Sequence, residues 1–211
     1  MGVMPVNKLL VTMSLPIVIS MLIQAMYNLV DSVFVAQINP DALTAVGMAF
    51  PMQSLMIAFQ TGLGVGMNAL VSRYLGQKKP YEAGLAATHA LILTALNYVI
   101  FLIVGLTAIP AFFSIQTHSE IIAGYGVEYL SIVCCGSLGL FFQIYGERIL
   151  QATGKTLLSM VSQILGAVIN IVLDPVFIFV FGWGIKGAAW ATVICQVVSG
   201  VLVIVYFWKF R

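Results

Sequence analysis

Two aspartates lie within long apolar runs, where an ionised side chain is costly. Asp31 and Asp174 are flanked on both sides by apolar residues, in the runs NLVDSVFV and NIVLDPVF. An ionised carboxylate in a low-polarity medium costs several kcal/mol or more. Acids in such runs mark ion pathways or proton relays, so both residues are candidates for binding a cation.

Polar side chains recur at helical spacing around both aspartates. Residues three, four or seven positions apart share one face of a helix, and a polar face on an apolar helix must meet another polar face or a water-filled cavity. In chain order, four such stripes are Ser20, Gln24, Tyr27 and Asp31; Gln53 and Gln60; Gln163, Asn170 and Asp174; and Thr192 and Gln196.

We expect the side chains of these stripes to line a cavity. Those we assign to its lining are Gln24, Tyr27, Gln53, Gln163 and Gln196. The alternative is that each polar side chain merely joins two helices through a hydrogen bond. For Gln53 or Gln60 taken alone, we favour that alternative.

The oxygen atoms of carboxylate, amide and hydroxyl groups are the ligands of hard cations. Asp31, Asn170, Asp174 and Thr192 supply all three kinds, and we predict that they bind a cation such as Na⁺. A buried pair of carboxyl groups can instead hold a proton, and would then titrate as a unit. The residue types permit either ion and imply no other cofactor.

Six apolar runs must position these side chains. A helix that crosses a bilayer needs about 20 mostly apolar residues, and the runs that meet this requirement are 9–35, 43–71, 85–109, 121–145, 156–181 and 186–208. They are continuous and lack the alternation of membrane strands. We therefore predict an all-α polytopic membrane protein with six transmembrane helices.

The composition supports a lipid bilayer as the surroundings of the chain. Hydrophobic residues make up 61% and charged residues 8% of the 211 residues, against about 25% charged in soluble domains. So few charges cannot cover the surface of a soluble fold. The same figures exclude a disordered protein, a nucleic-acid-binding protein and a secreted disulfide scaffold.

The cations indicate an orientation in the cell membrane. With a cytoplasmic N-terminus, eight of the nine Lys and Arg residues fall inside and only Lys186 falls outside. Those inside are Lys8, Arg73, Lys78, Lys79, Arg148, Lys155, Lys209 and Arg211. This bias predicts that both termini are cytoplasmic. Asp31, Asn170, Asp174 and Thr192 then lie at matching depths in the outer half of the membrane.

Prolines and one cap mark local features of the helices. Pro16 falls within the first run and predicts a bend, because proline lacks the donor for a regular helical bond; a structural kink and a moving hinge are both open. Pro175 directly follows Asp174 and should weaken the helix there. Asn39 and Pro40 are typical of a helix start, with Asn39 as the cap.

No pattern typical of an enzyme is present. His89 and His118 are isolated from each other and from cysteine, so a metal site has little support, and no hydrolase or transferase arrangement appears. Cys134, Cys135 and Cys195 lie in apolar runs without metal or redox spacing. We expect all three to be small buried hydrophobic residues.

Several segments resemble the multidrug and toxic compound extrusion (MATE) transporters, most closely their DinF-like branch. They are YNLVDSVFVAQINPDALTAVGMAFP (27–51), GVGMNALVSRYLGQKK (64–79), ERILQATGK (147–155), NIVLDPVFIF (170–179) and GIKGAAWATVICQ (184–196). They cover nearly the whole chain, in order and with the spacing of the family.

The resemblance implies a twelve-helix fold of two six-helix lobes that exports organic compounds in exchange for Na⁺ or H⁺. Residues 1–211 would form the N-terminal lobe, with the C-terminal lobe absent from this chain. By motif position, the cation site of the family corresponds to Asp31, Asn170, Asp174 and Thr192, and its bending proline to Pro16. The partner would be a second six-helix lobe or, less readily, a second copy of the chain.

The function predicted from the sequence is a cation-coupled antiporter that exports organic, cationic lipophilic compounds. One alternative is a flippase for a lipid-linked glycan, which has a related fold. A pyrophosphate-binding cavity should carry cations, and we expect no Lys or Arg in the middle of a span, which argues against it. A further alternative is a half-length fragment or scaffold without transport activity.

Overall fold

The computed structural model describes residues 6–209, which consist of helices joined by short turns and contain no strand. Its elements are α1 (Val6–Ala36), α2 (Pro40–Gly76), α3 (Pro80–Thr107), α4 (Ile109–Gln116), α5 (Glu120–Ala152), α6 (Thr156–Pro175), the π-helix η1 (Val176–Val180) and α7 (Ile185–Lys209). Six spans are long and apolar enough to cross a membrane, with α6 and η1 forming one of them. The predicted all-α, six-span fold is confirmed.

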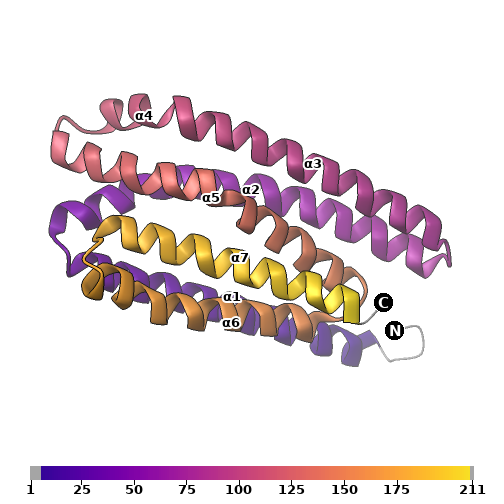
Figure 1. Cartoon of the computed structure of the whole chain (residues 1–211). Helices are drawn as coiled ribbons and strands as arrows, with labels where there is room; N and C mark the ends of the chain where they lie inside the picture. The colour runs from indigo at the N-terminus through magenta and orange to yellow at the C-terminus, as the bar shows by residue number, and fades with distance from the viewer. Residues whose placement is uncertain (1–5, 210–211) are drawn as a thin grey trace.

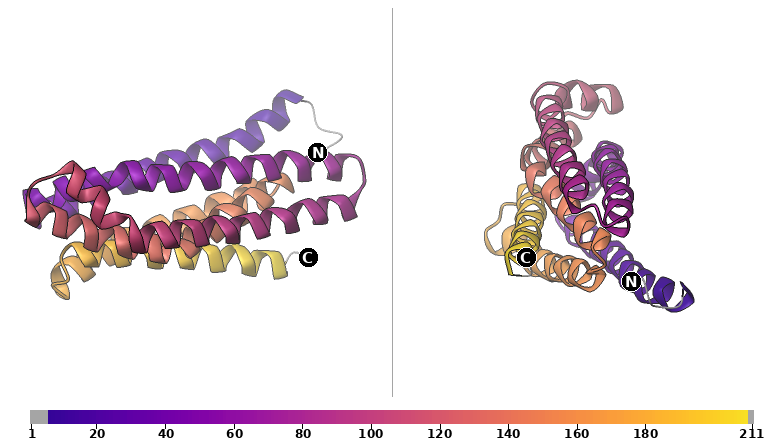
Figure 2. Two further views of the ribbon diagram at one scale, coloured as in Figure 1. Left: turned by 90° about the horizontal axis from the view of Figure 1, so that it is seen from above. Right: turned by 90° about the vertical axis from the view of Figure 1, so that its right-hand side faces the viewer.

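The helices form an elongated bundle with α5 at its centre (Figure 1). Helices α2, α3, α4 and α7 pack on α5, and α6 packs on α7. Helix α1 contacts the bundle chiefly through α6, and its beginning diverges from the other helices (Figure 2). The beginning of α1 and the end of α7 lie at the same end of the bundle, as six spans require.

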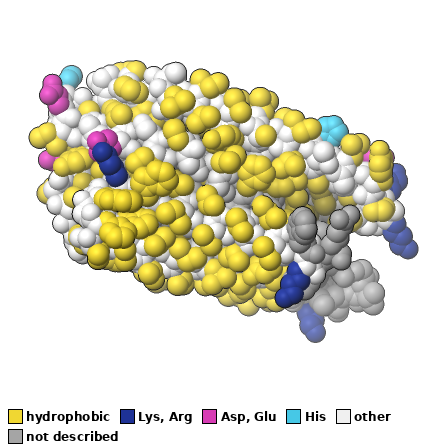
Figure 3. All heavy atoms as spheres, viewed as in Figure 1, with side chains coloured by type: hydrophobic (Ala, Val, Ile, Leu, Met, Phe, Trp, Pro, Cys, Tyr) yellow, Lys and Arg dark blue, Asp and Glu magenta, His cyan; other side chains and the backbone are white. Residues whose placement is uncertain are grey.

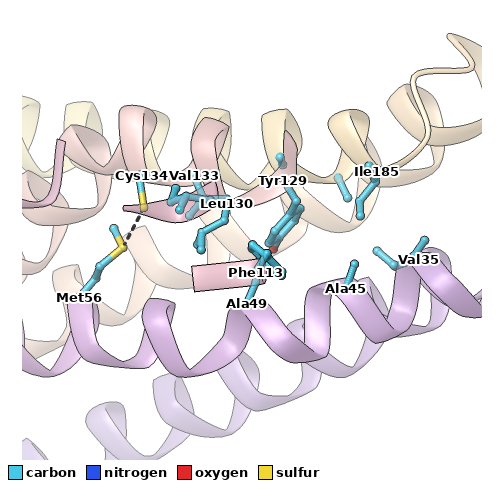
Figure 4. Packing of buried hydrophobic residues seen from close by; sticks show 14 of the residues in the cluster. Val35, Ala45, Ala49, Met56, Phe113, Tyr129, Leu130, Val133, Cys134 and Ile185 are labelled. Carbon is cyan, nitrogen blue, oxygen red and sulfur yellow. Dashed lines mark hydrogen bonds between the residues drawn. The ribbon is translucent and has the colours of Figure 1, made fainter. Parts of the chain in front are cut away.

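A cluster of buried apolar side chains joins α2, α4, α5 and the start of α7 (Figure 4). Small side chains such as Ala45 and Ala49 of α2 face the larger Tyr129 and Leu130 of α5. Phe113 of α4 reaches into the same cluster, and its ring occupies the space that a Cβ at position 126 would need. Gly126 therefore lets α4 pack closely on α5.

Glycines also bring α5 and α7 close together. Gly136 and Gly139 of α5 face Val193 and Val197 of α7, and a Cβ at position 139 would lie only 2.9 Å from the backbone nitrogen of Val197. Lipid tails are as apolar as these side chains, so burial alone does not hold membrane helices together. Close packing of small residues supplies the missing attraction by van der Waals contact.

The structure differs from the sequence expectations in several helix ends and in one acidic residue. The segment between the third and fourth runs, expected as a polar break, contains the short helix α4. Helix α5 continues to Ala152 rather than ending near position 145. Glu128, inside the expected 121–145 run, is a third acid in a span. It is exposed near the start of α5, and its Oε1 lies 3.0 Å from Lys186 Nζ in an ion pair. Apolar content alone does not reveal helical turns beyond the bilayer core.

Two local predictions agree with the structure. Asn39 caps α2, with its side-chain oxygen accepting a hydrogen bond from the Ala42 amide at 2.6 Å, and Pro40 follows in the first turn. After Asp174 and Pro175 the regular helix gives way to the π-helix η1. The helix is therefore altered where Pro175 was expected to weaken it.

The charged side chains are separated along the bundle (Figure 3). On the visible face, Lys and Arg gather toward the end at which α1 begins and α7 ends, which we call the basic end. The broad surface between the ends is largely apolar, as expected for a lipid-facing side. Arg211 lies outside the described residues.

The close approach of α5 and α7 can be tested by adding one carbon atom. We expect Gly139→Ala to destabilise the protein by about 1–3 kcal/mol, because backbone atoms of α7 cannot move aside easily. Gly66→Ala is the control, since a Cβ there meets nothing within 4 Å. The measurement is thermal unfolding in detergent, and equal unfolding temperatures for both variants would contradict this packing.

Candidate cation-binding site

The two aspartates predicted from the sequence meet at the contact between α1 and α6. Asp174 and Asn170 of α6 are fully buried, and the Asn170 amide donates to Asp174 Oδ1 at 3.3 Å. The carboxyl group of Asp31, on α1, lies within hydrogen-bonding reach of Asp174. A hydrogen bond between two carboxyl groups requires one of them to carry a proton. Without that proton, a cation must offset their repulsion.

Four buried side-chain atoms of the described residues have no hydrogen-bond partner, and all four are oxygens. They are Asp31 Oδ1, Asn170 Oδ1, Asp174 Oδ2 and Gln196 Oε1. Buried polar atoms are nearly always paired, because an unpaired one costs free energy. Unpartnered acceptors without unpartnered donors are suited to an electropositive ligand.

Asp31 and Gln196, but not Asn170 or Asp174, line a cavity of about 130 Å³, which we call the Asp31 cavity. Residues from α1, α2, α5 and α7 line it, including the predicted Gln24, Tyr27, Gln53, Thr192 and Gln196. Its volume corresponds to roughly four waters at about 30 Å³ each, enough for a partly hydrated ion. The Thr192 hydroxyl donates to the Ala188 carbonyl at 3.0 Å, so its oxygen keeps lone pairs for a ligand.

A second polar cavity, of about 300 Å³, surrounds Glu147, and we call it the Glu147 cavity. Glu147 is only 6% exposed and accepts hydrogen bonds from the Gln143 and Gln163 amides. The predicted Gln163 therefore faces this cavity rather than the Asp31 cavity. Arg148 also lines it, and its guanidinium donates to Gln151.

Glu147 was missed because the fourth run was expected to end at position 145. The signal that identifies it is a polar stripe, Gln143, Glu147 and Gln151, at intervals of four residues. That stripe crosses the expected end of the span, and it becomes visible only when the helix is continued to Ala152.

Other candidate residues have structural roles. Gln60 is fully buried; it donates to Thr94 and to the Phe141 carbonyl and accepts from Asn97, so it joins α2, α3 and α5. This matches the hydrogen-bonding interpretation of Gln60, whereas Gln53, which interacts with Tyr129, also lines the Asp31 cavity.

Pro16 and the cysteines lie outside the group of unpartnered oxygens. α1 continues through Pro16, whose carbonyl accepts from the Ser20 hydroxyl at 2.8 Å; a bend there stays a prediction. Cys134 and Cys195 are buried, as expected, but the expectation for Cys135 is wrong because it is exposed on the surface. It lies on the side of α5 turned away from the core, where an apolar environment is supplied by lipid rather than by protein.

The family profile of MatE matches residues 16–176 of the chain. The chain belongs to the MatE family. MatE relatives are transporters, so the prediction that this chain is not an enzyme is confirmed.

Several transporters are similar to this MatE chain over almost its whole length. It is 28% identical to the multidrug export protein MepA of Staphylococcus haemolyticus, over 95% of this chain and 44% of MepA. It is 29% identical to an FAD transporter of Shewanella oneidensis, over 95% of this chain and 46% of that protein. A transporter of the MOP superfamily from Pyrococcus furiosus has a TM-score of 0.92 and 34% identity, over 97% of this chain and 45% of the other. The chain spans less than half of each relative.

The distinction between Gln60 and the cavity residues predicts different effects of substitution in this MatE chain. We expect Gln60→Leu to destabilise the protein by about 1–3 kcal/mol, because buried partners on α3 and α5 lose their hydrogen bonds. Gln53→Leu, which alters a side chain at the Asp31 cavity, should have a smaller effect on thermal unfolding in detergent. A larger loss of stability for Gln53→Leu than for Gln60→Leu would reverse the assignment.

Proposed function

We propose that this chain is the N-terminal six-helix lobe of a cation-coupled antiporter that exports organic, lipophilic cations. The observation that carries the proposal is the group of four buried, unpartnered oxygens around Asp31 and Asp174. Membership of the MatE family supports a role in transport. The coupling cation binds to Asp31, Asn170, Asp174 and Thr192.

Na⁺ and H⁺ compete for this site in the proposed mechanism. A proton shared by Asp31 and Asp174 relieves their repulsion, but it leaves the amide oxygen of Asn170 unpaired. A Na⁺ ion draws on both carboxylates and on the amide and hydroxyl oxygens at the same time. Binding of Na⁺ would therefore release the shared proton, and protonation would release Na⁺.

Ion binding would act on α1. Asp31 is the only member of the proposed ion site on α1, whereas Asn170 and Asp174 are on α6, and α1 contacts the rest of the bundle chiefly through α6. An ion that joins Asp31 to Asp174 favours the packed position of the second half of α1. The segment before Pro16 can then change direction relative to the rest of α1, and Ser20 and Gln24, which follow Pro16, line the Glu147 cavity. Bending at Pro16 would alter the space available to a substrate.

A second six-helix unit completes the transporter in this proposal. Alternating access requires one lobe to move against another around a central site, and the relatives are more than twice as long as the matched segment. The second unit is a C-terminal lobe or, less readily, a second copy of the chain. The excess of Lys and Arg at the basic end supports cytoplasmic termini in the cell membrane.

An anionic nucleotide is a second candidate substrate. One relative is an FAD transporter, and Arg148 lines the Glu147 cavity. Asp31 and Glu147 line the two cavities against this single cation, so a cationic substrate has the stronger support. The same balance of charge weakens the case for a flippase that binds pyrophosphate. A transport-inactive scaffold would bind no coupling ion.

Cation binding predicts stabilisation by Na⁺. We expect NaCl to raise the thermal unfolding temperature of the purified chain above its value in equimolar choline chloride, since binding at 100 times Kd adds about 2.7 kcal/mol. Asp31→Asn and Asp174→Asn should abolish the difference. Glu128→Gln, at the exposed ion pair with Lys186, is the control that should keep it. If the wild type unfolds at the same temperature in NaCl as in choline chloride, Na⁺ is not the coupling ion.

Export provides the second test. We expect Asp174→Asn to reduce efflux of the lipophilic cation ethidium at least tenfold in cells that produce the protein, because the coupling ion loses a ligand. Efflux is followed by ethidium fluorescence, with Glu128→Gln as the matched control and FAD release measured in parallel. Unchanged efflux in Asp174→Asn cells would rule out coupling through this site.

A further inference from the structure

A groove of about 540 Å³ lies between α2 and α3, and we call it the α2–α3 groove. The residues that line it are separate from those of the Asp31 cavity and the Glu147 cavity. A Cβ added at Gly62 or Gly66, which are exposed and line the groove, would meet nothing within 4 Å. The space above these glycines is therefore open, and its volume is that of a ligand site, about 300–1,000 Å³.

The α2–α3 groove has the length of one lipid acyl chain. On α2 its lining extends from Gly62 to Tyr74, a stretch of about 18 Å at about 1.5 Å per residue. Half of the hydrocarbon core of a bilayer is about 15 Å thick. Leucines border the groove on both helices, and Leu70, Leu85 and Leu93 are between 42% and 47% exposed. A hydrocarbon chain from one leaflet therefore fits this groove in both length and polarity.

The polar side chains of the α2–α3 groove lie toward the basic end, where the turn between α2 and α3 is found (Figure 1). Tyr74 is in the last turn of α2, and Glu82 is in the first turn of α3. His89 lies two turns further along α3, and its Nδ1 donates to the Leu85 carbonyl at 2.8 Å, so Nε2 remains for a further contact. The other lining residues are glycine, alanine, leucine and methionine. The groove therefore suits a ligand with one polar end and a long apolar part.

Three cations stand at the polar end of the α2–α3 groove. Arg73, Lys78 and Lys79 are exposed in the last turn of α2 and in the turn that follows it. Their place beside the groove is fixed, because Arg73 precedes Tyr74 and the Lys79 amide donates to the Tyr74 carbonyl at 2.9 Å. Three positive charges here face the single negative charge of Glu82. Clusters of Lys and Arg at the end of a membrane helix attract anionic lipid headgroups.

Lys78 occupies a backbone position that favours glycine. Its φ is 57°, in the left-handed region that costs a residue with a side chain free energy. The turn between α5 and α6 has the same pattern of backbone hydrogen bonds, and there Gly154, with a φ of 81°, takes the equivalent position. Strained residues persist where the surrounding structure or a function offsets their cost. A role for the charge of Lys78 accounts for a lysine at this position.

We propose that the α2–α3 groove binds an anionic phospholipid, phosphatidylglycerol, with one acyl chain in the groove and the phosphate beside Arg73, Lys78 and Lys79. The hydroxyl groups of the glycerol headgroup can donate to Glu82, so the acid does not oppose this ligand as it would a bare phosphate. The site goes beyond the proposed function, because it uses none of the residues assigned to the coupling ion. Its ligand is a component of the bilayer rather than a transported compound.

Native mass spectrometry of the purified chain in detergent tests the selectivity for the headgroup. The probes are phosphatidylglycerol, phosphatidylethanolamine and phosphatidylcholine, all with dioleoyl chains and each titrated separately. We expect the wild type to bind phosphatidylglycerol about fivefold or more tightly than the other two, since each nearby Lys or Arg contributes about that factor. Lys78→Gln combined with Lys79→Gln should abolish this preference. The control is Lys8→Gln combined with Lys209→Gln, which removes the same charge from α1 and α7 at the basic end and should keep it.

The groove itself is tested by filling it. We expect Gly66→Leu to weaken binding of phosphatidylglycerol about tenfold, because the leucine takes the place of the acyl chain and its van der Waals contacts are lost. Gly47→Leu is the matched control, since Gly47 is an exposed glycine of α2 outside the groove and a Cβ there also meets nothing within 4 Å. Gly47→Leu should bind phosphatidylglycerol as the wild type does.

Wild-type affinity of Gly66→Leu for phosphatidylglycerol overturns the inference, and so does equal affinity of the wild type for all three lipids. A dimer of the wild type that Gly66→Leu abolishes also overturns it, because the groove would then hold a second copy of the chain. If Gly66→Leu does not fold, phosphatidylglycerol with a photoreactive acyl chain is crosslinked to the wild type. Labelling of residues 62–93, located by mass spectrometry, supports the site, and labelling only elsewhere overturns it.

Discussion

A carboxyl group inside a bilayer must have its negative charge compensated by a proton, a cation or several hydrogen-bond donors. Much of this fold serves to position buried acids so that this charge can be compensated. Asp31 and Asp174 come from helices that neighbour each other in space but are far apart in the sequence. Apart from the Asn170 amide, which donates to Asp174, the buried polar atoms recorded near them are unpartnered oxygens. Glu147 meets the same requirement differently, by accepting from two glutamine amides. The two acidic centres therefore differ in how much of their charge the protein itself compensates.

The surrounding bundle keeps these centres apart from lipid. Helix α5 contacts helices on both sides of the bundle and contributes residues to both cavities. Its glycines allow α7 to approach, which places Thr192 and Gln196 opposite α1. Polar groups such as Gln60 that are not part of a cavity have their own partners. Close backbone packing and complete hydrogen bonding thus confine unpartnered oxygens to one region.

The sequence was sufficient for the spans and for the residues that converge at α1 and α6, because both follow from local rules. Long apolar runs require helices, and helical spacing determines which side chains share a face. The same rules could not tell that Gln60 joins helices while Gln53 lines a cavity. A spacing of seven residues puts both side chains on one face of α2, and what each one contacts depends on the neighbouring helices. They also missed Glu147, because hydropathy does not indicate where a helix ends beyond the bilayer core. The exposure of Cys135 likewise depends on which side of α5 faces lipid.

Because α1 contacts the bundle chiefly through α6, that one contact influences which conformations of α1 are populated. A helix held chiefly by one neighbour changes position by exchanging contacts with that neighbour, and a ligand that prefers one position shifts the population toward it. Changing such an equilibrium from 1:99 to 99:1 takes about 5.5 kcal/mol of differential binding. A cation bound between α1 and α6, as proposed, would act on the contact that sets this balance, so one ion would redistribute the conformations of a 31-residue helix.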